Sequence, residues 1–379
     1  MVIGLLKERA GEKRVAFLPE IVAALIKKKV TVLVEKDAGE TAFITDLQYS
    51  EAGAKIVERQ TIFSDSNLIL QIQAPHRSDL EMLNAKQVWV SAFNPLVNNE
   101  LVREIRSKGI TSFSLDMIPR TSRAQAMDVL SSMATVSGYR AVLDAAYRLP
   151  VFFPMFMSAA GTIRPANVLI LGAGVAGLQA ISAARKLGAQ VEVFDVRSAV
   201  KEEVMSLGAK FVEVEGAKDD KAAGGYAVEQ DEDFKKRQQE AINLKASKAD
   251  VVICTAQIPG RKAPLLLPKA ALDSMKPGSV IIDLAASSGG NCDLTEDGRI
   301  VEYNKVSIVG KSNYVSEMPV DASRMFGKNA FNFISLLISE EGEMQLNFED
   351  ELVLGTCITH EGELYNERVK SLLENKTTI

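Results

Sequence analysis

The feature that most constrains the fold is a glycine pattern between two apolar segments, within NVLILGAGVAGLQAISAARKLGAQVEVFDVR at residues 167–197. Residues 168–171 form an apolar, branched run that is typical of a buried parallel strand. Three glycines follow at the spacing G-x-G-x-x-G, namely Gly172, Gly174 and Gly177. Apolar residues at helical spacing then lead into a second apolar strand, which ends at Asp195. This order of strand, glycine turn, helix, strand and acid predicts a dinucleotide-binding unit.

Each glycine of the pattern has a distinct expected role. Gly172 makes the tight turn from strand to helix, and Gly174 has no Cβ, so that a pyrophosphate can approach the backbone. Gly177 allows the helix to pack closely on the strand. The start of the helix offers N–H groups and the positive end of its dipole to the phosphates. The alternative is a glycine-rich turn that binds no ligand.

Asp195 indicates which nucleotide the unit takes. A carboxylate at the end of the second strand accepts hydrogen bonds from a ribose diol and repels a 2′-phosphate, which favours NAD(H) over NADP(H). Arg197 lies two residues further along. It either weakens this preference or is a solvated arginine on the surface, and the sequence leaves both possibilities open.

Alternating strand and helix patterns predict an α/β protein of two doubly wound Rossmann-like domains with parallel sheets. The length of 379 residues is enough for two or three domains. Two long helices, one in the second part of 120–147 and one at 321–338, are expected to cross between the domains. The expected N-terminal domain comprises residues 1–133 plus 320–379, and the NAD(H)-binding Rossmann domain comprises residues 134–319.

Two segments depart from this regular pattern. Residues 215–248 form an oversized, charged insertion that contains Gly225 and Tyr226. The portion before a helix near residue 231 is expected to be a mobile loop that closes over a ligand, or else a solvated insertion. Residues 352–365 are expected to form a β-hairpin that serves as an interaction arm.

Composition narrows the possible functions. The chain has 44 Lys and Arg against 49 Asp and Glu, a net charge of −5, and nothing in it suggests nucleic-acid binding. The three cysteines lie far apart and there are only two histidines, so we expect no metal site and no disulfide framework, and a reducing compartment. No stretch approaches the roughly 20 apolar residues of a membrane span.

The polar segment RTSRAQAMDVLSS, residues 120–132, is a second candidate site. Four of its residues can reach one cleft if the last three begin a helix: Arg120, Gln125, Asp128 and Ser131. The alternative is a helix cap at Thr121 or Ser122, with Asp128 facing solvent. A further charged segment, residues 7–20, either binds a small anion or is a surface loop. No residue pattern supplies a general base, which favours a reaction that moves a hydride and no proton at this site.

Longer segments carry a resemblance to a known family. The chain resembles the NAD(H)-binding component, domain I, of proton-translocating nicotinamide nucleotide transhydrogenases in six segments between residues 119 and 364: PRTSRAQAMDVLSSMA, VSGYRAV, FPMFMSAAGTIRPANVLILGAGVAGLQAI, KPGSVIIDLAASSGGNC, KNAFNFISLLI and EDELVLGTCITHEGEL. The resemblance implies direct hydride transfer between NAD(H) on this chain and NADP(H) on a partner domain. A separate membrane component would couple the transfer to proton translocation.

The resemblance also implies roles for individual residues. The residues that would contact the nicotinamide carboxamide, pyrophosphate or ribose and orient the ring are Arg120, Gln125, Asp128 and Ser131. Gly174 and Val175, which lie between Gly172 and Gly177 in the sequence, would hold the pyrophosphate. The adenosine ribose and its surroundings would be bound by Asp195, Val196 and Arg197. Gly225 and Tyr226 would lie on the closing loop, and Gln257 would lie against the adenosine or nicotinamide side.

The implied assembly is a homodimer that docks on the NADP(H)-binding domain and the membrane subunit. It would be cytoplasmic and peripheral to the inner membrane.

Two other interpretations remain open. The family is similar to alanine dehydrogenase, which keeps an arginine matched here by Arg14. It also uses a lysine and a histidine where this chain has Gln73 and Phe93. Without those proton-handling groups, amino-acid oxidation should fail. A nucleotide sensor without catalysis is the third interpretation, but the polar cluster at 120–131 would then have no purpose.

Overall fold

In a computed structural model, described for residues 1–216, 231–258 and 260–374, the chain forms two compact units. Unit 1 comprises Met1–Met133 and Val315–Ile379, and unit 2 comprises Ala134–Tyr314.

One long helix continues from the first unit into the second. The Ala-rich helix α6 (Val129–Arg148) begins in unit 1 and ends in unit 2, as expected of a crossing helix. The expected second crossing helix, α11 (Pro319–Ile334), instead lies wholly within unit 1. The chain has already returned to unit 1 at Val315, ahead of the helix.

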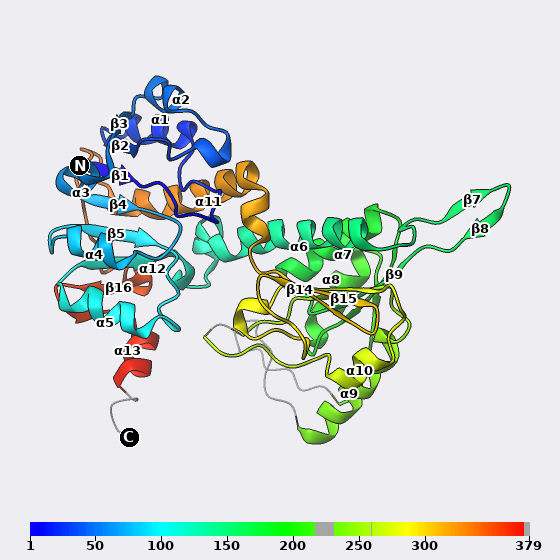
Figure 1. The fold of residues 1–379 in the computed structure, drawn as a ribbon. Helices are drawn as coiled ribbons and strands as arrows, with labels where there is room; N and C mark the ends of the chain where they lie inside the picture. Colours follow the sequence, from blue (N-terminus) through cyan, green and yellow to red (C-terminus); the bar gives the residue numbers. More distant parts are fainter. Residues whose placement is uncertain (217–230, 259, 375–379) are drawn as a thin grey trace. The chain divides into compact units, whose positions relative to one another are not determined.

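Unit 1 is built on an eight-stranded sheet of order β17-β16-β6-β5-β4-β1-β2-β3 (Figure 1). Six adjacent strands, from β6 to the edge strand β3, are parallel: β1 (Val2–Leu5), β2 (Thr31–Glu35), β3 (Lys55–Val57), β4 (Leu68–Leu70), β5 (Val88–Ser91) and β6 (Thr111–Ser114). Its helices are α1 (Pro19–Lys27), α2 (Asp46–Glu51), α3 (Arg59–Asp65), α4 (Arg77–Met82), α5 (Asn99–Ser107), α11, α12 (Glu351–Thr356) and α13 (Glu367–Glu374). Apolar clusters cover both faces of the sheet, which is why β1, β4 and β5 are largely apolar in sequence.

The C-terminal segment completes this sheet. The predicted hairpin forms only in part: α12 comes first, followed by β16 (Cys357–His360) and β17 (Glu363–Leu364), which pair antiparallel. Strand β16 pairs with β6, and the Thr359 and Ser112 hydroxyls lie 2.7 Å apart. The expectation of an interaction arm here is therefore wrong, because the hairpin is the edge of the sheet.

Unit 2 is built on a seven-stranded sheet of order β11-β10-β9-β12-β13-β15-β14. Its strands are β9 (Asn167–Leu171), β10 (Gln190–Phe194), β11 (Lys210–Phe211), β12 (Val251–Cys254), β13 (Val280–Asp283), β14 (Arg299–Tyr303) and β15 (Val306–Gly310), parallel except for β14. Its further helices are α7 (Val175–Lys186), α8 (Lys201–Ser206), α9 (Glu232–Ala246) and α10 (Lys269–Asp273). The Rossmann-like fold predicted for both halves is confirmed, with an antiparallel edge added to each parallel sheet.

A separate two-stranded hairpin projects from unit 2, and the sequence does not predict it. It consists of β7 (Phe156–Ser158) and β8 (Gly161–Ile163), and Figure 1 shows it extending beyond the packed elements. All six strand residues are exposed.

Among the described helices, none has the length and apolar character needed to cross a membrane. No group of three or more His, Cys, Asp or Glu in the described ranges is placed to hold a metal ion.

Candidate functional site

The sheet of unit 2 reverses its strand order between β9 and β12. In open α/β sheets, ligands bind beyond the carboxyl ends of the strands at such a point. The glycine loop follows β9, Asp195 follows β10, and Gln257 lies three residues beyond the end of β12. The structure therefore brings most of the predicted nucleotide-binding residues to one edge of this sheet: Gly172, Gly174, Val175, Gly177, Asp195, Val196, Arg197 and Gln257.

Two glycines of the loop are required by the protein itself. Gly172 has a φ of +106°, in the left-handed region that favours glycine, and a Cβ there would lie 2.6 Å from the Thr255 hydroxyl. At Gly177 a Cβ would lie 1.9 Å from the carbonyl oxygen of Gly172. The tight turn and the close packing of helix on strand are thus as predicted.

Gly174 is different, because the protein does not require it. It precedes α7 with an ordinary φ of −76°, it is exposed, and a Cβ built on it would meet no atom within 4 Å. Beside it are the first N–H groups of α7, which have no acceptor within the helix. Open space at a helix start suits the close approach of an anion. The residues present therefore fit a pyrophosphate.

The Asp195 carboxylate fastens the glycine loop to the second strand. Its Oδ2 accepts from the Ala173 N–H at 2.7 Å and from Arg197 Nη2 at 2.7 Å. Its Oδ1 accepts from the backbone N–H and from Nε of Arg197, both at 2.9 Å. Arg197 is therefore not merely a solvated surface arginine. It pairs with the acid, and the four lone-pair positions of the carboxylate are all used.

Further residues that support this edge are not marked in the sequence. The Thr255 hydroxyl donates to the Gly172 carbonyl at 3.0 Å. The buried Asn291 brackets Ala256, accepting from its N–H at 3.1 Å and donating to its carbonyl at 2.9 Å. These contacts fix the backbone just before Gln257, whose own Nε2 donates to the Leu284 carbonyl at 2.9 Å. Asn291 falls in one of the segments that carry the family resemblance, but residue spacing does not signal this role, because the partners of its side chain lie more than 25 residues away in sequence.

Gly225 and Tyr226, predicted for the closing loop, lie outside the described residues.

The predicted residues of 120–131 lie in unit 1, apart in sequence from the glycine loop. Gln125 is exposed on the 3-10 helix η3 (Ser122–Met127), and Arg120 is exposed just before it. Asp128 caps α6: its Oδ1 accepts from the Ser131 N–H at 2.9 Å, and its Oδ2 accepts from the Ser131 hydroxyl at 2.6 Å. The helix therefore starts at Val129, within the second part of 120–147 as expected, but neither at Gln125 nor after a cap at Thr121 or Ser122; Asp128 is its cap.

Two acidic side chains and a buried arginine of the charged segment 7–20 have partners within unit 1. Arg14 is buried and binds Glu12 through Nε at 2.8 Å and Nη2 at 2.6 Å. The Glu8 carboxylate accepts from the N–H groups of Ile72 and Gln73, at 2.5 and 3.1 Å. Burial raises the pKa of Glu8 to about 8. Because Arg14 is already paired and Glu8 is held by backbone N–H groups, the structure favours neither an anion site nor a surface loop in this segment.

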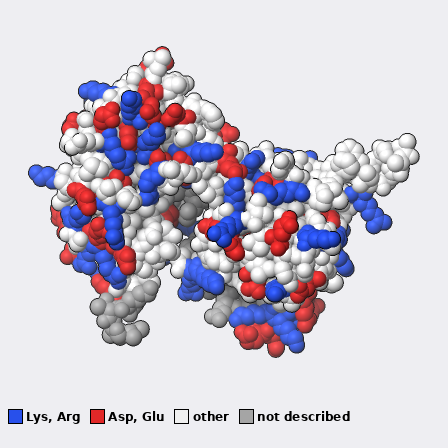
Figure 2. All heavy atoms as spheres, viewed as in Figure 1, with Lys and Arg blue, Asp and Glu red and all other residues white. Residues whose placement is uncertain are grey.

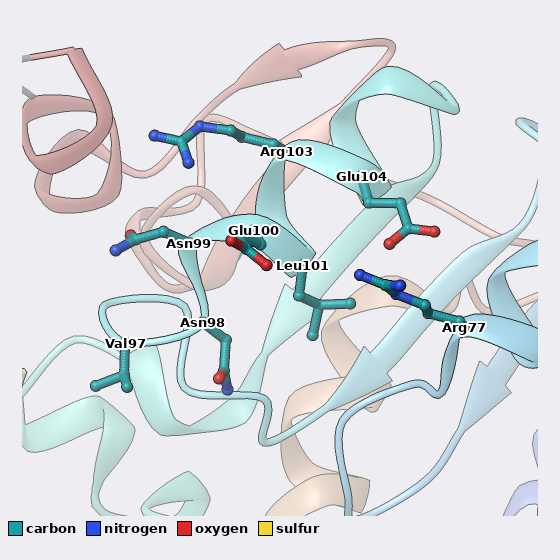
Figure 3. Close-up of a pocket in the computed structure, with 8 residues that line it drawn as sticks. All are labelled: Arg77, Val97, Asn98, Asn99, Glu100, Leu101, Arg103 and Glu104. Carbon is teal, nitrogen blue, oxygen red and sulfur yellow. The ribbon is translucent and has the colours of Figure 1, made fainter. Parts of the chain in front are cut away.

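A hollow of about 550 Å³ lies elsewhere on unit 1, around the start of α5. Figure 3 shows Arg77 and Glu104 extending toward each other beside it. Its lining mixes basic and acidic side chains with asparagines, whereas ligand pockets are mostly apolar with a few polar groups. It contains none of the predicted site residues, so we do not place the functional site there.

The comparisons with known proteins agree over nearly the whole chain. The family described as "Alanine dehydrogenase/PNT, C-terminal domain" matches residues 141–367, and "Alanine dehydrogenase/PNT, N-terminal domain" matches residues 4–137. The first part of the NAD(P) transhydrogenase alpha subunit of Rhodospirillum rubrum is 44% identical over 372 residues, covering 96% of this chain and 97% of that protein.

A solved structure of transhydrogenase from Sinorhizobium meliloti superposes with a TM-score of 0.88. It is 39% identical and covers 96% of this chain and 100% of its own. Alanine dehydrogenase of Mycolicibacterium smegmatis is more distant, at 25% identity over 99% of this chain and 97% of that protein. On this identity and coverage, the chain belongs to the family of NAD(P) transhydrogenase alpha subunits, which are oxidoreductases.

Proposed function

We propose that the chain binds NAD(H) at the carboxyl edge of the unit 2 sheet and exchanges a hydride with NADP(H) held by a partner domain. A separate membrane component would couple the exchange to proton translocation. The chain itself would be cytoplasmic and peripheral to the membrane. The observation that carries the proposal is Gly174, a glycine that the protein does not need, exposed at the start of α7.

The position of Asp195 supports NAD(H) rather than NADP(H) at this site, although its pairing with Arg197 weakens the repulsion of a 2′-phosphate. The acid ends the strand next to the glycine loop, where a ribose diol is expected to bind. Since all four of its lone-pair positions are used, a ribose hydroxyl reaches Asp195 only by replacing a contact such as one from Arg197. Arg197 therefore yields to the NAD(H) ribose in this proposal, and Val196 lies beside it.

The nicotinamide end is assigned to the segment of unit 1 that includes η3. Arg120, Gln125, Asp128 and Ser131 would contact the carboxamide, the pyrophosphate or the ribose and orient the ring. A hydride moves directly only when the reacting atoms are about 3–3.5 Å apart. The task of these residues is positioning, because the dihydronicotinamide supplies the hydride chemistry.

The test is reduction of an NADP⁺ analogue by NADH. It is run with the chain alone and with an NADP(H)-binding domain added. We expect reduction only in the mixture. A chain that binds NADH but gives no reduction in the mixture would favour a nucleotide sensor, and NADH formation from L-alanine and NAD⁺ would favour an amino-acid dehydrogenase.

Alanine dehydrogenase activity is disfavoured by the contacts in unit 1. Arg14 is already bound by Glu12, and Gln73 and Phe93 carry no group that titrates near neutral pH. No residue at these positions removes the proton that amino-acid oxidation must release.

Gln125→Asn and Asp128→Asn should each slow hydride transfer by about tenfold or more while changing NADH affinity less than threefold. Asparagine caps a helix about as well as aspartate, so α6 should keep its start in the second variant. Rates in the reconstituted mixture and NADH titrations measure the two effects. Asp46→Asn, in an exposed contact to the Asp37 N–H near α2, is the control that should change neither. Wild-type rates in both site variants would remove these residues from the site.

We also propose that the chain is a homodimer and that the β7–β8 hairpin is covered by the second copy. Apolar side chains of the hairpin and its base are largely exposed, including Phe152, Met155, Phe156 and Met157. Figure 2 shows the hairpin as an almost uncharged surface. Two-stranded hairpins are marginal in water on their own, so an apolar one calls for a covering surface.

Met157→Asp should convert the dimer to a monomer, because it buries a charge in that interface. Met157 is 76% exposed in the single chain, so the fold of unit 2 should survive. Sedimentation equilibrium gives the mass. Leu244→Asp, at a 56% exposed leucine of α9, is the matched control and should stay dimeric. A dimer that persists in Met157→Asp would rule out the hairpin as the contact.

A further inference from the structure

The segment that contains Gln125 is anchored by three contacts to the C-terminal portion of unit 1. At its start, Pro119 packs against α12, where a Cβ on Gly355 would lie 2.4 Å from the proline ring. In its middle, Arg123 Nη1 donates to Asp350 Oδ1 at 3.0 Å, beside the start of α12. Near its end, the Ala126 carbonyl contacts α11.

The third contact is the unusual one. Two amides on adjacent turns of α11 converge on the same carbonyl: Asn329 Nδ2 and Asn332 Nδ2 each donate to the Ala126 oxygen at 2.8 Å. One donor already satisfies a carbonyl for most purposes, and a typical hydrogen bond contributes only about 1 kcal/mol. The double contact therefore does more to fix the orientation of the Ala126 peptide than stability alone requires.

Asn329 carries a cost in this arrangement. Its side chain is buried at 7% exposure, and within the described residues its Oδ1 is a buried oxygen with no hydrogen-bond partner. An unpaired buried polar group costs about 1–3 kcal/mol. Such a cost in a native structure calls for an explanation, and positioning of a neighbouring functional group is one.

Ala126 stands between the two residues that the proposed function places at the nicotinamide. Gln125 precedes it directly, and Asp128 follows two residues later at the start of α6. A peptide held at its carbonyl cannot rotate without breaking both amide contacts. The orientation of η3, and with it the direction in which Gln125 points, is thereby coupled to α11.

We propose that Asn329 and Asn332 are positioning residues for hydride transfer, which hold the Ala126 carbonyl so that Gln125 and Asp128 keep their orientation. This inference rests on the proposed function. The two asparagines are not proposed to set nucleotide affinity, which would come mainly from unit 2, or the overall stability of the protein.

Asn332→Asp is the variant that tests the contact most sharply. The replacement has nearly the same shape, but a carboxylate oxygen then faces the Ala126 carbonyl where a donor stood. Asn332 is partly exposed, so its charge stays solvated, whereas Asn329→Asp would bury a charge. We expect hydride transfer with the NADP(H)-binding domain to slow by about tenfold or more, with NADH affinity within twofold of wild type.

A second measurement does not depend on catalysis. In the full chain without nucleotide, the backbone amides of residues 122–128 should exchange with solvent at least about tenfold faster in Asn332→Asp. Asn332→Ala leaves the Asn329 donor in place and adds no opposing oxygen, so it should change both readouts less than Asn332→Asp does. Asn329→Ala/Asn332→Ala removes both donors and should behave like Asn332→Asp.

The matched control is Gln87→Ala. Gln87 is a buried amide of unit 1 whose Nε2 donates to the carbonyls of Phe63 and Ser66 at 2.7 and 2.9 Å. The Gln87→Ala variant should have a lower melting temperature but unchanged amide exchange at residues 122–128 and an unchanged rate of hydride transfer.

Unchanged exchange and transfer in both Asn332→Asp and the double variant would overturn the inference. If Gln125→Asn also transfers at the wild-type rate, the proposed function of the segment fails instead.

Discussion

Gly174→Val should weaken NADH binding by more than about 100-fold, close to 3 kcal/mol, while leaving the fold intact. The side chain would enter the open space at the start of α7 into which the pyrophosphate is proposed to fit. The residue has an ordinary φ and its Cβ meets no protein atom within 4 Å, so the change strains the protein little. The expected cost is that of a poorer helix cap, about 1 kcal/mol, or a few degrees in Tm.

Gly177→Ala is the matched contrast three residues further along. Its new Cβ would lie 1.9 Å from the Gly172 carbonyl oxygen, so helix and strand must separate. Overpacking of this kind costs roughly 1–3 kcal/mol or more, and Tm should fall clearly. NADH fluorescence titration and thermal melting of the two variants separate ligand space from packing. Wild-type NADH affinity in Gly174→Val would place the pyrophosphate elsewhere.

The elements that the sequence predicts well are those whose signals are local. Strands β9 and β10 form where the two apolar segments around the glycine pattern predict them, because a buried parallel strand is a short apolar run between polar turns. The glycine fingerprint is equally local, since the turn, the open position and the close packing all depend on neighbours within a few residues or on the adjoining strand. The strand–turn–helix–strand core of unit 2 and the glycine loop of its candidate site follow from this one stretch.

The hairpin and the C-terminal edge are not predictable in the same way, for physical reasons. The segment FFPMFMSAAGTI lacks both the alternation of a half-buried strand and a two-residue turn signal, because its strands are not part of either large sheet. The tail resembles a free hairpin in sequence because its pairing partner, β6, is more than 240 residues away. Residue spacing carries no information about such a partner.

Distant partners limit the prediction of residues 120–131 in unit 1 as well. The polar residues of this segment are visible in the sequence, but the contacts that hold them in place are not. Asn329 and Asn332 are over 200 residues from Ala126, and Asp350 is 227 residues from Arg123. The cap at Asp128 is local, but Thr121 and Ser122 also fit the cap preference, so the sequence does not single it out. Anchors of this kind require the tertiary structure.

Glu8 should make the protein less stable as the pH rises from about 4.5 to 8, and Glu8→Gln should remove that dependence. Burial raises the pKa of folded Glu8 from 4.5 to about 8, with a further contribution from the charge of Glu12, although two backbone N–H groups act against it. The folded protein keeps this proton through the window in which the unfolded chain releases it. Rising pH therefore favours the unfolded state until about pH 8, above which the contribution is constant.

The size of this effect is on the order of 5 kcal/mol, because each unit of pKa corresponds to about 1.4 kcal/mol. The glutamine side chain of the variant stays neutral at every pH and should lose part of one hydrogen bond, a constant offset of about 1 kcal/mol. Urea unfolding of both proteins between pH 5 and 8.5 should therefore give free-energy curves that diverge, with Glu8→Gln the more stable protein at the alkaline end. Parallel curves would contradict the prediction.

Glu12→Gln is the internal comparison, because the neighbouring carboxylate should behave in the opposite sense. Burial alone would raise the pKa of Glu12, but the hydrogen bonds and charge of Arg14 outweigh it and hold the pKa below 4.5. The stability that this ion pair contributes is fully present at a pH above the pKa of Glu12 in the unfolded chain. It is lost only as the pH falls through the lowered pKa of Glu12 in the folded protein. Near neutral pH the variant leaves Arg14 buried without its counter-charge, which costs about 3–5 kcal/mol. Two buried carboxyl groups four residues apart thus shift stability in opposite directions, because burial dominates at Glu8, whereas direct hydrogen bonds to a guanidinium outweigh burial at Glu12.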